Sequence, residues 1–184
     1  MTASTIAPPM TVEEFLLLPE EDGDGRFELI DGEIFAEPMG GFVHDIVKNN
    51  LKDLFEVAGV QSHGYRCLVE QSYEVSPDDL LIPDVSVMRR DRLTRPSGGN
   101  SPAAGTPEVV FEVSITDQNW VQQKKISAYL DNGAQAVCYV FPELRTVVVY
   151  TTDRWRRLRE QDTLEFPALL PGLTIPVSAI FDNI

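Results

Sequence analysis

The sequence predicts an α/β protein in which strands and helices are mixed around one sheet. Apolar residues recur at helical spacing from Val43 to Phe55, which is typical of a helix that packs on a sheet. Other apolar segments are short and bounded by turn residues, and residues 136–141 are continuously apolar, as in a strand covered on both faces. The hydrophobic fraction of 43% and the charged fraction of 24% are ordinary for a soluble globular protein.

Length and composition indicate one folded unit. We expect residues 1–10 to form a flexible tail and residues 11–184 to form a single domain, because 184 residues suffice for one substantial core. No apolar run approaches the roughly 20 residues that cross a bilayer, and no signal peptide is recognisable, so the expected location is the cytoplasm. Cys67 and Cys138 lie in apolar, strand-like segments without CxxC spacing, which favours buried reduced thiols.

Capping and turn residues predict the individual elements. Thr11-Val-Glu-Glu is a capping box that opens a short helix closed by Pro19, and Asp31-Gly32 is a tight turn between two strands within residues 26–35. Gly59 and Asn132-Gly133 are placed to end the two longer helices. The remaining expectations are strands over 65–75, 80–88, 108–113, 136–141, 147–150 and 155–159, a helix over 119–130, a long surface loop over 91–107, and an apolar C-terminal segment that docks on the body.

The formal net charge of −14 counts against tight general binding of duplex DNA, which usually requires a basic surface. Two arginine clusters leave a local basic surface open. The alternative is that one cluster is a solvated loop and the other a charged edge strand. The clusters are Arg89, Arg90, Arg92 and Arg95, and Arg154, Arg156, Arg157 and Arg159.

Two carboxylates at the ends of apolar strands are the strongest indication of chemistry. Pro83 interrupts the strand ladder directly before Asp84, which holds this carboxylate at a strand end. Strand alternation puts Glu112 on the same face as Val110, and a buried unpaired carboxylate costs several kcal/mol, so Glu112 requires a metal, a base or a hydrogen-bond donor as its partner. Two such carboxylates are suited to a hard divalent metal. A strand-end glutamate with one salt bridge is the simpler alternative.

The helix over 119–130 supplies a cation. Helical geometry puts Lys125 at the border of the packed face, whereas Lys124 lies nearer Trp120 and the polar side. We therefore prefer Lys125 as the functional lysine and keep Lys124 as the second choice.

Two further polar residues are candidates for the site. Glu28 has apolar strand neighbours and is expected to orient a metal-bound water or the lysine; its alternative is a surface salt bridge with Arg26. His44 opens the second helix and is a candidate donor to a phosphate of the substrate; its alternative is a cap or a surface histidine.

Several motifs, in this order and spacing, resemble one family from about residue 10 to residue 182. They are Thr-Val-Glu-Glu-Phe, Phe27-Glu-Leu-Ile-Asp-Gly-Glu33, the histidine that opens a helix, Pro83-Asp84-Val85, Glu112-Val113, Lys125 with Tyr129, Asn132-Gly133 and Leu-Pro-Gly-Leu. Together they are similar to the Uma family of restriction endonucleases, a branch of the PD-(D/E)xK nuclease superfamily.

The resemblance implies a restriction-endonuclease-like α/β fold with a mixed central sheet flanked by helices. It also implies that Asp84, Glu112 and the backbone carbonyl of Val113 bind Mg2+ or Mn2+, and that Lys125 polarises the attacking water. The superfamily usually has its lysine two residues after the second acid, where this chain has Ser114. The chain thus resembles the variant in which the lysine has migrated to the following helix.

The leading hypothesis is a metal-dependent endonuclease that hydrolyses DNA phosphodiester bonds, with a homodimer as the expected assembly because the superfamily often cuts two strands with two copies. A second hypothesis is a catalytically weak or inactive binding module that retains the nuclease fold, for example as a component of a defence or mobile-element system. A third is an acidic regulator without nucleic-acid contact, which only the charge of −14 supports.

Overall fold

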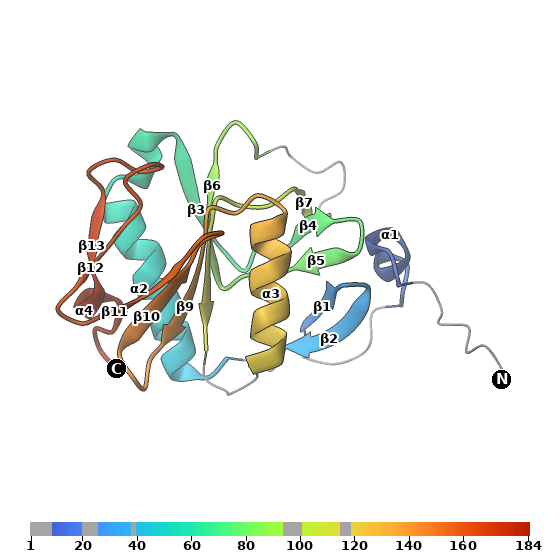
Figure 1. Ribbon diagram of the computed structural model, residues 1–184, viewed down its shortest axis with the longest axis horizontal. Coiled ribbons are helices and arrows are strands. Elements are labelled where there is room, and N and C mark those ends of the chain that lie inside the picture. Colours follow the sequence, from blue (N-terminus) through green and yellow to red (C-terminus); the bar gives the residue numbers. More distant parts are fainter. Residues whose placement is uncertain (1–8, 20–25, 38–39, 94–100, 115–118) are drawn as a thin grey trace.

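The computed structural model describes residues 9–19, 26–37, 40–93, 101–114 and 119–184 (Figure 1). Its architecture confirms a mixed central sheet flanked by helices. The sheet has the order β11-β10-β9-β8-β6-β3, with β8 and β9 parallel. Its strands are β3 (Tyr65–Val69), β6 (Val85–Arg89), β8 (Val109–Val113), β9 (Ala136–Phe141), β10 (Thr146–Tyr150) and β11 (Trp155–Arg159).

The expectation of one sheet is wrong, because the described strands form three. A second sheet has the order β2-β1-β5-β4-β7, and a two-stranded sheet pairs β12 with β13. The reason lies in two interruptions: Glu70 has a φ of 52°, which ends the expected strand 65–75 after β3, and Pro83 lies between β5 and β6. The strands are β1 (Arg26–Ile30), β2 (Glu33–Glu37), β4 (Tyr73–Ser76), β5 (Asp79–Leu81), β7 (Ala103–Ala104), β12 (Thr163–Glu165) and β13 (Thr174–Pro176).

The predicted caps and turns are confirmed where the structure describes them. Thr11 caps α1 (Val12–Leu16) in a capping box with Glu14. The turn between β1 and β2 has positive φ angles of 51° at Asp31 and 71° at Gly32. The other helices are α2 (Phe42–Val57), the single 3-10 turn η1 (Val60–His63), α3 (Asn119–Asp131) and α4 (Val177–Ile180).

The two long helices cover opposite faces of the central sheet (Figure 1). On one face, Leu51 and Phe55 of α2 pack against Phe111 of β8, and the C-terminal segment from Leu164 to Phe181 completes this core, as expected. On the other face, Ile126 and Tyr129 of α3 join residues of the central sheet to residues of the second sheet. Helix α3 is therefore held between the two sheets. Among the described helices, none combines the length and apolar character that crossing a bilayer requires.

Some expectations fall outside the described residues. These are residues 1–8 of the expected tail and residues 94–100 of the loop over 91–107. Within the remainder of the loop, Ala103–Ala104 forms β7 and pairs in parallel with β4, so this part belongs to a sheet. Cys67 and Cys138 are both buried free thiols, as predicted.

Candidate active site

The site lies at the end of the central sheet where β6 begins and β8 ends. Val85 of β6 pairs with Phe111 of β8 in an antiparallel register. Continuing this register by one residue brings Asp84 opposite Glu112, and side chains of directly opposed residues lie on the same face, about 5 Å apart at Cβ. Both residues are 6% exposed. Glu112 shares its face with Val110, as strand alternation predicted. The helices α2 and α3 also begin at this end of the sheet (Figure 1).

Two neighbouring elements hold the Asp84 carboxylate in one orientation. The backbone N–H of Val113 donates to Asp84 Oδ2 at 2.7 Å. The other oxygen, Oδ1, lies 2.9 Å from Nε2 of His44 in the first turn of α2. Asp84 thus connects the end of β8 to the start of α2.

His44 is a buried partner of Asp84 and not a surface histidine, since it is 6% exposed. Burial by itself would lower the pKa of His44, but the hydrogen bond and the charge of Asp84 outweigh it and raise the pKa above its ordinary value. Gly40 packs directly against the imidazole, because a Cβ at this position would lie 2.3 Å from His44 Nδ1. The absence of a side chain at Gly40 therefore leaves room for the ring.

Lys125 joins the carboxylates of two different sheets. Its ammonium lies 2.9 Å from Glu28 Oε2 and 3.0 Å from Glu112 Oε1, and it donates to Glu112 Oε2 at 3.1 Å. The lysine is 4% exposed. Ser114, two residues after Glu112, accepts a hydrogen bond on its hydroxyl from Gln122 of α3 at 2.8 Å. The ammonium therefore reaches Glu112 from the helix.

Glu28 of β1 is the most deeply buried acid of the group, at 1% exposure. Its Oε1 accepts a hydrogen bond from the backbone N–H of Ile82 at 2.6 Å, while Oε2 contacts Lys125. Arg26, the alternative partner, pairs with Glu70 at 3.1 Å. Glu28 is thus placed to fix the lysine ammonium.

Lys124, the second choice from the sequence, points to a different surface. Its ammonium lies 3.1 Å from Asp31 and 3.0 Å from Glu33, beside the rings of Phe35 and Trp120. This geometry separates it from Asp84 and Glu112 and favours Lys125.

Two residues of this region were missed as members of the site. The hydroxyl of Tyr129 donates to Glu112 Oε1 at 3.3 Å, and complete burial raises the pKa of Tyr129 well above its ordinary value. Lys48, 8% exposed, lies one turn after His44 and contacts Asp45 and Glu70. Helical spacing is the signal that finds both, because each lies four residues after a candidate, Lys125 or His44.

The site buries three carboxylates together with a lysine and a histidine. Glu28 and Glu112 contact the Lys125 ammonium, Asp84 contacts His44, and the Tyr129 hydroxyl donates to Glu112. Buried charges require compensating partners, and the printed contacts supply Lys125 for Glu28 and Glu112 and His44 for Asp84. Among the described residues, no group of three or more His, Cys, Asp and Glu side chains is placed to hold a metal ion by itself. A metal at this site would therefore complete its coordination with backbone carbonyl, water or substrate oxygens, as Mg2+ commonly does.

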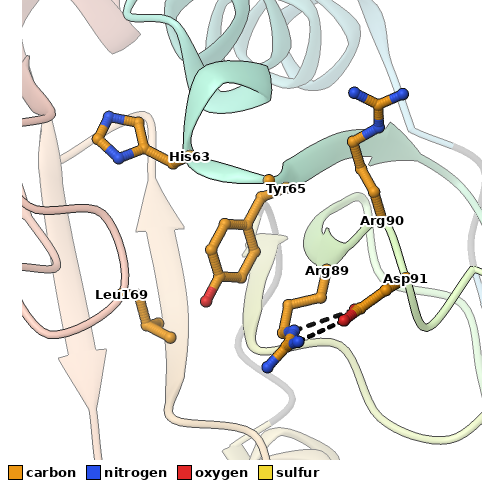
Figure 2. A pocket seen from close by; sticks show the side chains of 7 residues that line it. His63, Tyr65, Arg89, Arg90, Asp91 and Leu169 are labelled. Carbon is orange, nitrogen blue, oxygen red and sulfur yellow. Dashed lines mark hydrogen bonds and ion pairs between the residues drawn. The ribbon is translucent and has the colours of Figure 1, made fainter.

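The arginine clusters lie away from these carboxylates. An open pocket of about 730 Å³ is lined by His63, Tyr65, Arg89 and Arg90. Figure 2 shows these side chains and the ion pair between Arg89 and Asp91. Arg89 ends β6 and Asp84 precedes it, so roughly 16 Å of strand separate this pocket from the site. In the second cluster, Arg156, Arg157 and Arg159 belong to β11, an edge strand of the central sheet, and Arg154 directly precedes it. Arg95 lies outside the described residues.

The architecture is the restriction-endonuclease-like α/β class that the sequence predicted. The model of the family described as "Uma2: Putative restriction endonuclease" matches residues 12–178, and the chain belongs to this family. The crystal structure of a putative nuclease of the DUF820 group from Anabaena variabilis shows the same fold, with a TM-score of 0.80 and 24% identity over 94% of this chain and 98% of that chain.

A complex of DrdV with DNA gave a TM-score of 0.38 and 13% identity over 77% of this chain and 14% of that chain, a likeness too slight to bear on this protein. A comparison with curated proteins gave no match.

Proposed function

We propose that this protein is a metal-dependent endonuclease that hydrolyses DNA phosphodiester bonds. The observation that carries the proposal is the buried cluster of Asp84, Glu112, Glu28 and Lys125 in a member of a family of putative restriction endonucleases. Taking charged side chains out of water is costly, and a buried group of three carboxylates is suited to a site that binds a cation together with a substrate.

Asp84 and Glu112 are the proposed side-chain ligands of Mg2+ or Mn2+, with the backbone carbonyl of Val113 as a third oxygen. The set consists of hard oxygen donors, which suits both ions. When bound, the metal would stabilise negative charge on the phosphate and make water a stronger nucleophile at neutral pH.

The protein's own groups have distinct roles in this proposal. Lys125 donates a hydrogen bond to the attacking water and offsets negative charge that develops on the phosphate. Glu28 positions the Lys125 ammonium, and Tyr129 positions Glu112 through its hydroxyl. His44 orients Asp84 through Nε2 and, with substrate bound, is a candidate donor to a phosphate oxygen.

The second candidate is a binding module that retains the nuclease fold without efficient cleavage. The net charge of −14 favours it, because a chain with this charge gains little from displacing counterions on duplex DNA. The two functions differ in one readout, which is strand cleavage.

The test is cleavage of supercoiled and single-stranded DNA with Mg2+ or Mn2+, and with EDTA as the metal-free control. Asp84→Asn and Lys125→Met should each abolish nicking, whereas Lys52→Met, purified in the same way, should retain it because Lys52 is a partly exposed residue of α2 that pairs with Asp53 and Glu56. Metal-dependent nicking that persists in Asp84→Asn would point to a contaminating nuclease. Absence of cleavage by the intact protein across metals and salt concentrations would favour the binding module.

A further inference from the structure

An exposed aromatic pair lies beside the candidate active site. Trp120, in the first turn of α3, is 59% exposed. Its ring contacts Phe35 of β2 edge to face, with the ring centroids 5.3 Å apart and an interplanar angle of 64°. Exposed apolar side chains that lie together, unlike single ones, are typical of binding surfaces. We call Trp120 and Phe35 the aromatic platform.

Both halves of the platform are connected to the Glu28–Lys125 pair. Phe35 is the cross-strand partner of Glu28, which places the two side chains on the same face of the second sheet, about 5 Å apart at Cβ. Trp120 precedes Lys125 by five residues, which is roughly 7.5 Å along the helix axis and about 140° around it. The platform is therefore linked to the site through Phe35, and Trp120 forms its exposed end.

The charges around the platform argue against a phosphate site. Lys124 is the cation nearest the two rings, at 5.6 Å from the Phe35 centroid and 6.0 Å from the Trp120 centroid. Its ammonium is already paired with Asp31 and Glu33, so this group of three side chains carries a net negative charge. Phosphates are repelled here, whereas a neutral, flat base can still stack on an aromatic ring.

Stacking on Trp120 requires a base with a free face. In a duplex, both faces of an internal base are covered by its neighbours, so stacking on a protein ring demands a single strand or a base extruded from the helix.

We propose that Trp120, supported by Phe35, stacks an unpaired base of single-stranded or locally unpaired DNA next to the scissile phosphate. The proposal rests on the proposed function and names its substrate class. It assigns Trp120 to substrate binding and gives it no part in the chemical step.

The chain contains a matched control. Trp155 is 64% exposed, similar to Trp120, and is the only other tryptophan of the sequence. It opens β11, three strands from β8 in the central sheet, or about 14 Å at the usual strand spacing. A base stacked beside Lys125 would not contact Trp155.

Fluorescence with a 12-nucleotide single strand in EDTA separates the two tryptophans without cleavage. In Trp155→Phe, which retains Trp120, the oligonucleotide should quench the emission; in Trp120→Phe, which retains Trp155, the emission should stay unchanged. Trp120→Ala should weaken binding of the single strand about 5- to 100-fold, and Trp155→Ala less than about twofold. A duplex of the same sequence should bind more weakly and respond little to Trp120→Ala.

Equal effects of the two tryptophan variants, or equal loss of duplex and single-strand binding in Trp120→Ala, would overturn the platform. If intact protein shows metal-dependent cleavage that Asp84→Asn abolishes, and Trp120 is still not quenched, the platform fails while the endonuclease function stands. If the intact protein neither binds nor cleaves any DNA, the proposed function fails and the platform fails with it.

Discussion

Removal of the Lys125 ammonium should destabilise the protein strongly, and the contacts allow the magnitude to be worked out. The ammonium lies within 3.1 Å of three carboxylate oxygens, at 2.9 Å from Glu28 and at 3.0 and 3.1 Å from Glu112. In Lys125→Met these buried carboxylates lose their shared cation. Removing one partner of a buried ion pair costs about 3–5 kcal/mol, because the remaining charge stays away from water. We expect a loss of this size in the free energy of unfolding.

Urea denaturation at pH 7 in EDTA measures this loss, with Lys124→Met as the matched control. Lys124 is the neighbouring lysine and also contacts two carboxylates, but its side chain is 28% exposed and both partners are more exposed still. Such surface pairs contribute about 1 kcal/mol or less.

A double variant tests the cause of the loss. Glu28→Gln retains an amide oxygen that can accept the Ile82 N–H while it removes one carboxylate charge. Adding it to Lys125→Met should therefore restore part of the stability. The reasoning is refuted if Lys125→Met and Lys124→Met are equally stable, or if the double variant is less stable than Lys125→Met alone.

Two further predictions concern packing and thiol reactivity. Gly40→Ala should lower the unfolding temperature by several degrees, because its Cβ would lie 2.3 Å from His44 Nδ1 and overpacking costs about 1–3 kcal/mol. Gly41→Ala is the control and should be close to neutral, because a Cβ at this position has no neighbour within 4 Å. Equal melting temperatures of the two variants would contradict the packing argument. Burial raises the pKa of Cys67 to about 12, so roughly one thiol in ten thousand is ionised at pH 8. A thiol reagent should therefore label Cys67 and the buried Cys138 only after denaturation. Rapid labelling of the native protein would show that these cysteines are accessible.

Local patterns predicted much of the fold. Capping boxes, glycines and helical spacing depend on neighbours within a few residues, so α1, α2 and α3 follow from the chain itself. The division of the strands into separate sheets was not predictable in this way. A positive φ at Glu70 carries no clear signal in a non-glycine residue, and pairing of β7 with β4 joins segments about thirty residues apart.

For the site, the sequence by itself determined which residue types were available: two strand-end acids, a lysine at the border of a helix face, and Glu28 among apolar neighbours. Only the tertiary structure decided the partners. Asp84 contacts His44, Lys125 contacts both Glu28 and Glu112, and Tyr129 completes the group, from elements that span about a hundred residues. The physical reason is that sequence periodicity specifies which face a side chain occupies, whereas ion pairing depends on which faces the packing of α3 between two sheets brings within about 3 Å.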